Sequence, residues 1–267
     1  MLLASPARLI EKIGFESIYI TTTIGSMVIF LLQCVGNIFT PPIRFKAVLR
    51  QIYFIGARSL LVISVTGLFT GMVLALLAYY NLKQYGNMEL IGAATALGLI
   101  QELGPVLAAL MVIGRAGSAM TAELGIMRNS EQIDALECMG IDPYRFLITP
   151  KFIAMIFSLP LLTMVFDVVG IAGGYFVAVI SNDVASGSFI QGMVANVGWD
   201  DLRLGMVKPL SFSLIIVWIC SYNGYFVHQN RSGVFGAEGV SLVTTNAVVM
   251  SSVSVLALDY IVGLIML

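Results

Sequence analysis

The sequence predicts an all-α integral membrane protein: a bundle of five transmembrane helices, an N-terminal membrane-embedded or interfacial helix, and a short cytoplasmic helix. Apolar residues make up 58% of the 267 residues and charged residues 11%, whereas soluble domains have about 45–50% apolar and about 25% charged residues. One span needs about 20 apolar residues, so five spans leave little chain outside the membrane. We therefore expect a single domain over residues 1–267.

The predicted elements follow from six apolar stretches, which are 18–38, 60–80, 91–113, 152–180, 204–227 and 241–267. The last five are predicted to cross the membrane. The first is ambiguous, because it contains the threonine run 21–23 and follows the cations Arg8 and Lys12.

The positions of Lys and Arg predict the topology, because these residues are retained on the cytoplasmic side. The connection 39–59 contains no acid and is predicted to be cytoplasmic; its cations are Arg44, Lys46, Arg50 and Arg58. Segment 114–151 and the connection 228–239, with Arg231, return to the cytoplasm, while the acidic loop 181–203 lies outside. If 18–38 also crossed, Arg8 and Lys12 would lie outside, so we favour a membrane-embedded or interfacial helix there.

Small residues within the spans indicate close helix contact. Gly67, Gly71 and Ala75 form one ladder, and a second small face consists of Gly170, Gly173 and Gly174. Either ladder is compatible with ordinary packing or with a dimer interface. In the polar segment, Gly114, Gly117 and Gly125 are interpreted as tight-turn and close-packing positions.

Segment 114–151 is a polar island that holds nine of the 29 charged residues. Its second half predicts a helix with Asn129 or Ser130 as N-cap and Gly140 as its end. Ile133, Leu136 and Met139 recur at helical spacing, and acidic residues occupy the other faces. The helix either lies on the membrane or docks on a soluble partner, and its acidic polar face favours docking.

Ionisable residues inside apolar stretches are costly unless they are paired or hydrated. Glu102, beside Gln101 and before Pro105, is expected to line a water-accessible cavity, to pair with a cation, or both. Lys208 and Asp259 are explained by snorkelling or by a mutual pair, and Asp167 by a polar partner.

Enzymatic chemistry finds little support. His228 is the sole histidine, which excludes H-E-x-x-H sites. The chain contains no G-x-x-x-x-G-K-[ST] sequence, so any ATP that drives it must bind to another polypeptide. The odd set of widely spaced cysteines, Cys34, Cys138 and Cys220, implies neither disulfides nor a metal.

A long ungapped run resembles a known family. The run is ELGPVLAALMVIGRAGSAMTAELGIMRNSEQIDALECMGIDP, and SLPLL and WICSYNGY extend the match. It resembles the MlaE/YrbE permease family. The resemblance implies a homodimeric ABC-transporter permease in a Gram-negative inner membrane, which moves phospholipids to or from a periplasmic carrier and maintains outer-membrane lipid asymmetry.

The resemblance also implies partners and sites. The partners are a cytoplasmic ABC ATPase pair (MlaF-like) that binds ATP and Mg, a STAS-domain regulator (MlaB-like) and a hexameric MCE-domain ring (MlaD-like); this chain would hold no cofactor or metal. The coupling helix maps onto Glu131 to Met139, with Arg128, Asp134, Ala135 and Leu136, and the lipid cavity onto Glu102, Gln101, Tyr80 and Lys208. Residues 1–58 would form an N-terminal interfacial region and 59–267 the transmembrane core.

Two departures weaken the inferred headgroup contacts. Gln101 stands where a basic residue can occur in the family, and Leu242 and Asn246 stand at positions that are often Arg. A competing hypothesis is a stand-alone secondary transporter or channel that uses Glu102 and Asp167. A membrane-embedded lipid-modifying enzyme is disfavoured, because catalytic clusters are lacking.

Overall fold

The computed structural model describes residues 6–38, 44–84, 87–229 and 236–266, and within these ranges the regular structure is entirely helical. This confirms the predicted fold class. Six stretches of the described chain are long and apolar enough to cross a membrane, namely Thr21–Ile38, Phe45–Lys83, Leu90–Asn129, Tyr144–Ser181, Trp199–Tyr225 and Gly236–Met266.

The α-helices, in chain order, are α1 (Pro6–Ile38), α2 (Phe45–Ile55), α3 (Leu60–Lys83), α4 (Leu90–Leu97), α5 (Gly104–Val112), α6 (Ser118–Asn129), α7 (Gln132–Cys138), α8 (Thr149–Tyr175), α9 (Ser186–Asn196), α10 (Trp199–Tyr225) and α11 (Gly236–Met266). Four π-helical segments interrupt or extend them: η2 (Gly98–Leu103), η3 (Ile113–Gly117), η4 (Tyr144–Ile148) and η5 (Phe176–Ser181). Short 3-10 turns occupy η1 (Ala57–Ser59) and η6 (Val227–Gln229).

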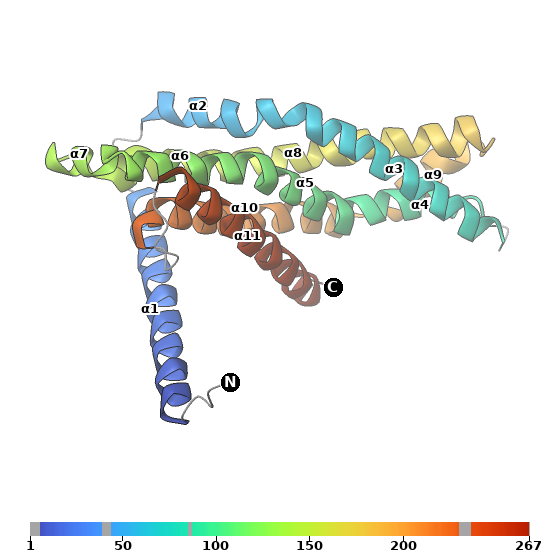
Figure 1. Cartoon of the computed structure of the whole chain (residues 1–267). Helices are drawn as coiled ribbons and strands as arrows, with labels where there is room; N and C mark the ends of the chain where they lie inside the picture. The colour runs from blue at the N-terminus through green and yellow to red at the C-terminus, as the bar shows by residue number, and fades with distance from the viewer. Residues whose placement is uncertain (1–5, 39–43, 85–86, 230–235, 267) are drawn as a thin grey trace.

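Helix α1 runs across the direction of the main bundle (Figure 1). Its second half packs against the end of the bundle, where Phe30 and Cys34 are buried. The indole N–H of Trp218 in α10 donates to the Met27 carbonyl at 2.9 Å, and the hydroxyls of Ser26 and Tyr222 are 2.5 Å apart. These contacts hold α1 across the bundle, and the interfacial position of 18–38 stays a prediction, since Thr21–Ile38 is also apolar enough to cross.

The two small-residue ladders are the two sides of one contact, between α3 and α8. A Cβ added at Gly71 would overlap the Gly170 carbonyl, and one at Gly173 would crowd the Leu68 carbonyl at 2.5 Å. Both ladders therefore bring α3 and α8 together within one chain, and ordinary helix packing accounts for them.

The third span continues into the polar segment as one helical run, from α4 through η2, α5 and η3 to α6. The expectation of tight turns at Gly114, Gly117 and Gly125 was therefore wrong. Close packing holds for two of them: a Cβ at Gly117 would lie 3.0 Å from the Cys220 sulfur, and one at Gly125 3.4 Å from Val240. The first half of the polar segment is thus part of the bundle and packs on α10 and α11.

Two helices lie in regions that the sequence suggested as connections. Helix α2 occupies much of 39–59 and packs on α8, and α9 lies within 181–203 and packs on α4. The start of α2 lies at the same end of the bundle as α7, while α9 lies at the opposite end (Figure 1). The basic connection and the polar segment therefore share one end, as the charge pattern predicts. Arg231 and the side chains of Arg8 and Lys12 lie outside the described part.

Candidate functional site

Three ionisable side chains from separate elements meet within the helical bundle. The Lys208 Nζ atom of α10 lies 2.9 Å from Glu102 Oε1 of η2 and 2.9 Å from Asp259 Oδ1 of α11. The Lys208 side chain is 0% exposed, that of Asp259 17% and that of Glu102 48%. Both contacts are ion pairs by distance. Their angles do not satisfy a hydrogen bond, so Lys208 Nζ and Asp259 Oδ1 have no hydrogen-bond partner among the described residues. This ion cluster joins the predicted Lys208–Asp259 pair to the predicted Glu102 site.

Local backbone features bring Lys208 to Glu102. Gly205, one helical turn before Lys208, packs against the Ile100 carbonyl, where a Cβ would lie 3.0 Å away, so α10 approaches η2 closely. Pro105 has no N–H and disfavours a regular helical turn before it, and the preceding residues, Gly98–Leu103, form the π-helix. Such wide turns frequently occur at functional sites. The proline-loosened backbone expected at Glu102 is therefore present.

The other two predicted cavity residues, Gln101 and Tyr80, contact residues outside the ion cluster. The Gln101 side-chain amide donates to Asp201 Oδ1 of α10 at 2.6 Å. Tyr80 of α3 packs its ring edge-on against Tyr79 and is 59% exposed. The cluster thus contains Glu102 and Lys208 but neither Gln101 nor Tyr80, and all four residues remain predictions as lipid contacts.

Asp167 of α8 has a different environment from the one expected. Its Oδ1 atom is buried and has no hydrogen-bond partner among the described residues. The carboxylate packs against Gly104, where an added Cβ would overlap Oδ1. The polar partner expected for Asp167 is therefore replaced by a glycine that leaves room for the carboxylate.

Helix α7 begins differently from the prediction. Its N-cap is Glu131, which has the left-handed φ of 57° and makes no side-chain capping bond. Ser130 instead donates to the Ile126 carbonyl of the preceding helix at 2.7 Å, and Asn129 donates to the Gly236 carbonyl at 3.0 Å. The predicted cap at Asn129 or Ser130 was wrong, because α6 extends as far as Asn129. The predicted end is confirmed, since Gly140 has φ +72°.

A polar network fixes α7 to the bundle through Arg128 of α6. Its Nη1 atom lies 2.7 Å from Asp134 Oδ1 and 4.0 Å from Glu137 Oε1. Its Nε–H donates to His228 Nδ1 at 3.3 Å, and the guanidinium lies 5.5 Å from the Tyr225 ring centre. The Tyr225 hydroxyl in turn donates to Glu137 at 3.1 Å. Arg128 and Asp134 therefore hold α7 in place from within the protein.

The apolar residues of α7 divide between the bundle and the surface. Ile133 is fully buried and Leu136 partly buried, whereas Met139 is 65% exposed and Ala135 and Glu131 are also exposed. The exposed group Glu131, Ala135 and Met139 is a free surface on this chain, and we name it the α7 surface. The predicted apolar stripe is split, because only its first residue faces the core.

Two polar links were missed by sequence reasoning. The Arg115 guanidinium donates to the Phe54 carbonyl at 3.0 Å and the Ser59 hydroxyl at 2.7 Å, which ties the junction of α2 and α3 to the third span. Lys151 Nζ, almost fully buried, lies 2.5 Å from Glu123 Oε2. Cations inside helices were the available signal, but their partners are 56 and 28 residues away.

Comparison with known proteins places these residues in one family. The family model described as Permease MlaE matches residues 48–265, which include the ion cluster, the Arg128 network and the α7 surface.

Individual relatives agree over most of the chain. The intermembrane phospholipid transport system permease protein MlaE of Haemophilus influenzae is 42% identical, covering 85% of both chains. A probable ABC transporter permease protein of Rickettsia bellii is 39% identical over 94% of this chain and 95% of its own. The chloroplastic protein TRIGALACTOSYLDIACYLGLYCEROL 1 of Arabidopsis thaliana is 35% identical over 86% of this chain and 64% of its own.

Proposed function

The chain belongs to the MlaE permease family and is a permease subunit of an ABC transporter, and we propose that it moves phospholipids. The Haemophilus influenzae relative is named for intermembrane phospholipid transport. We further propose that this chain works in a Gram-negative inner membrane, exchanges lipid with a periplasmic MCE-domain carrier, and so maintains outer-membrane lipid asymmetry. Residues 1–58 would form its N-terminal interfacial region and 59–267 its transmembrane core.

The ion cluster is the observation that carries this proposal. A cation within the bundle is costly unless it is paired, and Lys208 is paired with Asp259 and with the half-exposed Glu102. A polar site with a half-exposed carboxylate suits a ligand that brings a charged headgroup into an apolar environment. Gln101 and Tyr80 are proposed to line the same lipid path.

The partners follow from the family and from the α7 surface. We propose that α7 inserts into a groove on a cytoplasmic ABC ATPase, which binds ATP and Mg, because helix-in-groove docking uses an exposed apolar anchor such as Met139. A STAS-domain regulator, a periplasmic MCE hexamer and a second copy of this chain would complete the transporter.

The mechanism we propose relies on the continuity of the third span. Closure of the ATPase would push α7, and Arg128 would pass the movement to α6 through its ion pair with Asp134. Because α6, η3, α5 and η2 are one helical run, a shift of α6 reaches the wide turn that carries Glu102. The lipid-binding cavity would then narrow and expel its contents.

Reconstitution tests the proposal. The tagged chain, purified with its co-purifying subunits and placed in liposomes, should transfer fluorescent phospholipid to an acceptor only when ATP is present. The variant K208M should abolish the transfer, whereas R203Q, at an exposed arginine, should not. If the chain brings down no ATPase and instead supports gradient-driven flux, the competing secondary transporter that uses Glu102 and Asp167 is correct.

A further inference from the structure

A separate cavity of about 1000 Å³ lies between α2, α6 and the start of α8, and its lining includes neither Glu102 nor Lys208. It lies at the α7 end of the bundle, which the charge pattern predicts to be cytoplasmic. We propose that this cavity, the elbow pocket, holds the anionic phosphate headgroup of a resident lipid. The inference goes beyond the proposed transport, because it concerns a lipid bound to a fixed site.

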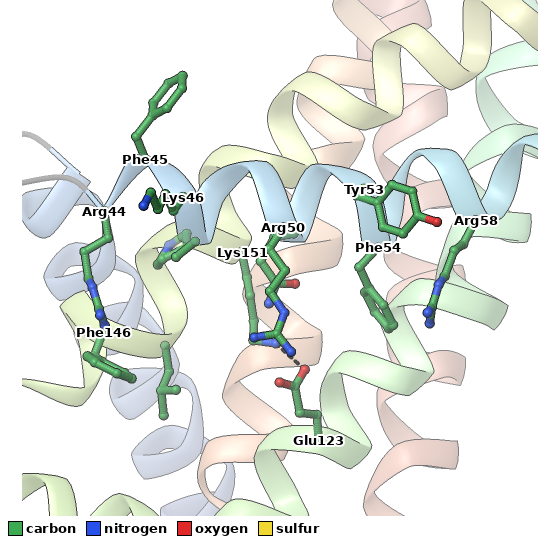
Figure 2. A pocket seen from close by; sticks show the side chains of 14 residues that line it. Arg44, Phe45, Lys46, Arg50, Tyr53, Phe54, Arg58, Glu123, Phe146 and Lys151 are labelled. Carbon is green, nitrogen blue, oxygen red and sulfur yellow. Dashed lines mark hydrogen bonds and ion pairs between the residues drawn. The ribbon is translucent and has the colours of Figure 1, made fainter.

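The charges of the elbow pocket favour an anion. Five cations line it against a single carboxylate, Glu123; they are Arg44, Lys46, Arg50, Arg58 and Lys151. Figure 2 shows Arg50 reaching from α2 toward Glu123 and Lys151. Since Lys151 Nζ already lies 2.5 Å from Glu123, the carboxylate is neutralised and the pocket keeps a positive excess. Basic pockets between helices on the cytoplasmic side are suited to anionic lipid headgroups.

The side chains around the pocket match the chemistry of a phosphate group. Lys151 is a buried ammonium at the floor, and Arg50 and Lys46 are exposed at the rim. In the described part of the chain, neither Arg50 nor Lys46 has a recorded ion pair or hydrogen bond. Guanidinium and ammonium groups both bind phosphate oxygens strongly, and Arg does so through two parallel hydrogen bonds. The two rim cations are therefore available to a ligand.

The apolar surroundings favour a lipid over a soluble phosphate compound. Phe54, Leu147 and Pro150 contribute to the lining. The adjacent face of α2 exposes Phe45, Leu49 and Tyr53, spaced one helical turn apart. Helix α2 leads through η1 directly into the span α3, so this face lies where acyl chains begin. A ligand with a phosphate head and an apolar tail satisfies both parts of the site.

The geometry of the pocket is fixed from several sides. The Arg44 guanidinium lies 4.2 Å from the Phe146 ring centre, which closes the end near η4. Arg115 of η3 holds the last turn of α2 through the Phe54 carbonyl. The pocket is therefore preformed by contacts that involve neither rim cation, and removing the rim charges should leave the fold intact.

Lipid retention tests this assignment without ATP. The purified complex is incubated with an equimolar mixture of dioleoylphosphatidylglycerol and dioleoylphosphatidylcholine, washed, and its bound lipids are counted by native mass spectrometry. We expect the wild type to retain the anionic dioleoylphosphatidylglycerol in preference to dioleoylphosphatidylcholine. In the double variant K46Q/R50Q, the ratio of bound phosphatidylglycerol to bound phosphatidylcholine should fall about fivefold for each charge removed. The variant K46R/R50K keeps both charges and should keep the wild-type ratio. Lipid bound elsewhere is common to all variants and cancels.

Two controls make the result decisive. R203Q removes another exposed arginine, at the opposite end of the bundle, and should retain the wild-type preference; an equal loss in R203Q overturns the proposal. Sn-glycerol 1-phosphate in excess should not displace the lipid, and displacement would identify the ligand as a soluble phosphate compound instead. If K46Q/R50Q melts at a lower temperature, K46Q alone, at an exposed residue, replaces it. Unchanged preference in the folded variant also overturns the assignment.

Discussion

Arg128 and Asp134 form an ion pair of 2.7 Å across the bend between α6 and α7. The pair joins the last turn of a helix that is continuous with the third span to a short helix with an exposed outer surface. Arg128 is mostly buried and Asp134 about half exposed. A seven-residue helix is too short to be stable alone, so its position depends on contacts of this kind.

The variant D134N should loosen α7 without unfolding the protein. Losing a half-exposed ion pair costs about 1 kcal/mol or less, so amide exchange in 132–138 should rise by up to about fivefold while the rest of the bundle is unchanged. ATP hydrolysis should continue with less lipid moved per ATP. The matched control is E131Q, because the Glu131 side chain makes no capping bond; faster exchange in E131Q would contradict the role given to Asp134.

The ion cluster predicts an order of stability among its variants. K208M leaves two carboxylates facing each other and should cost about 3–5 kcal/mol, as for other broken buried pairs. E102Q should cost least, because Glu102 is half exposed, whereas Lys208 and Asp259 are buried more deeply. D259N should lie between them.

The double variant K208M/D259N should lose less free energy of unfolding than its two single variants lose together. With Asp259 neutralised, Glu102 no longer faces the second negative charge that K208M alone leaves beside it. Thermal unfolding of all four variants in one detergent measures this coupling. Strict additivity would mean that Lys208 and Asp259 do not interact across their 2.9 Å separation.

Sequence reasoning succeeded where a property is local and failed where it depends on the packing of distant residues. Hydropathy located the spans, and the spacing of Gly67 and Gly71 indicated a close contact. The start of α7 was misplaced, because Ser130 bonds back to Ile126 and prolongs α6. The identity of a partner could not be predicted for Arg115 or Lys151, since each bonds to another helix.

Helices α2 and α9 illustrate the same limit. Helix α2 lies in the basic connection 39–59 and α9 in the acidic loop 181–203, and neither helix was predicted. Gly92 and Gly192 let α4 and α9 pack closely, because a Cβ at either would overlap a backbone carbonyl of the other side. A single sequence shows where these glycines are but does not show which helix each one packs against.

A glycine pair separates packing from backbone propensity. G71A places a methyl group against the Gly170 carbonyl and should destabilise the protein by about 1–3 kcal/mol, as other overpacked substitutions do. G25A, in α1, meets nothing within 4 Å and should stabilise by about 0.5–1 kcal/mol through helix propensity. Melting temperatures in detergent measure both. Equal shifts in the same direction would show that α3 and α8 do not meet as closely as described.

His228 gives the protein a pH dependence with a defined sign. Burial, and then the neighbouring Arg128 charge, lower the pKa of His228 below its ordinary value, while Asp134 opposes them. Its Nδ1 atom accepts from Arg128, so the folded protein favours the neutral ring. The unfolded chain, with a histidine pKa of about 6.5, binds the proton first as pH falls. This stabilisation is therefore complete above about pH 6.5 and declines as pH falls through the folded pKa.

The variant H228Q isolates the effect, because glutamine keeps a hydrogen-bond acceptor and does not titrate. Between about pH 7.5 and 5, the wild type should lose more melting temperature than H228Q, since carboxylates common to both proteins cancel in the difference. The loss should be accompanied by faster exchange in α7, because a protonated His228 cannot accept from Arg128 and repels it. Parallel pH profiles for the two proteins would mean that His228 does not support the Arg128 network.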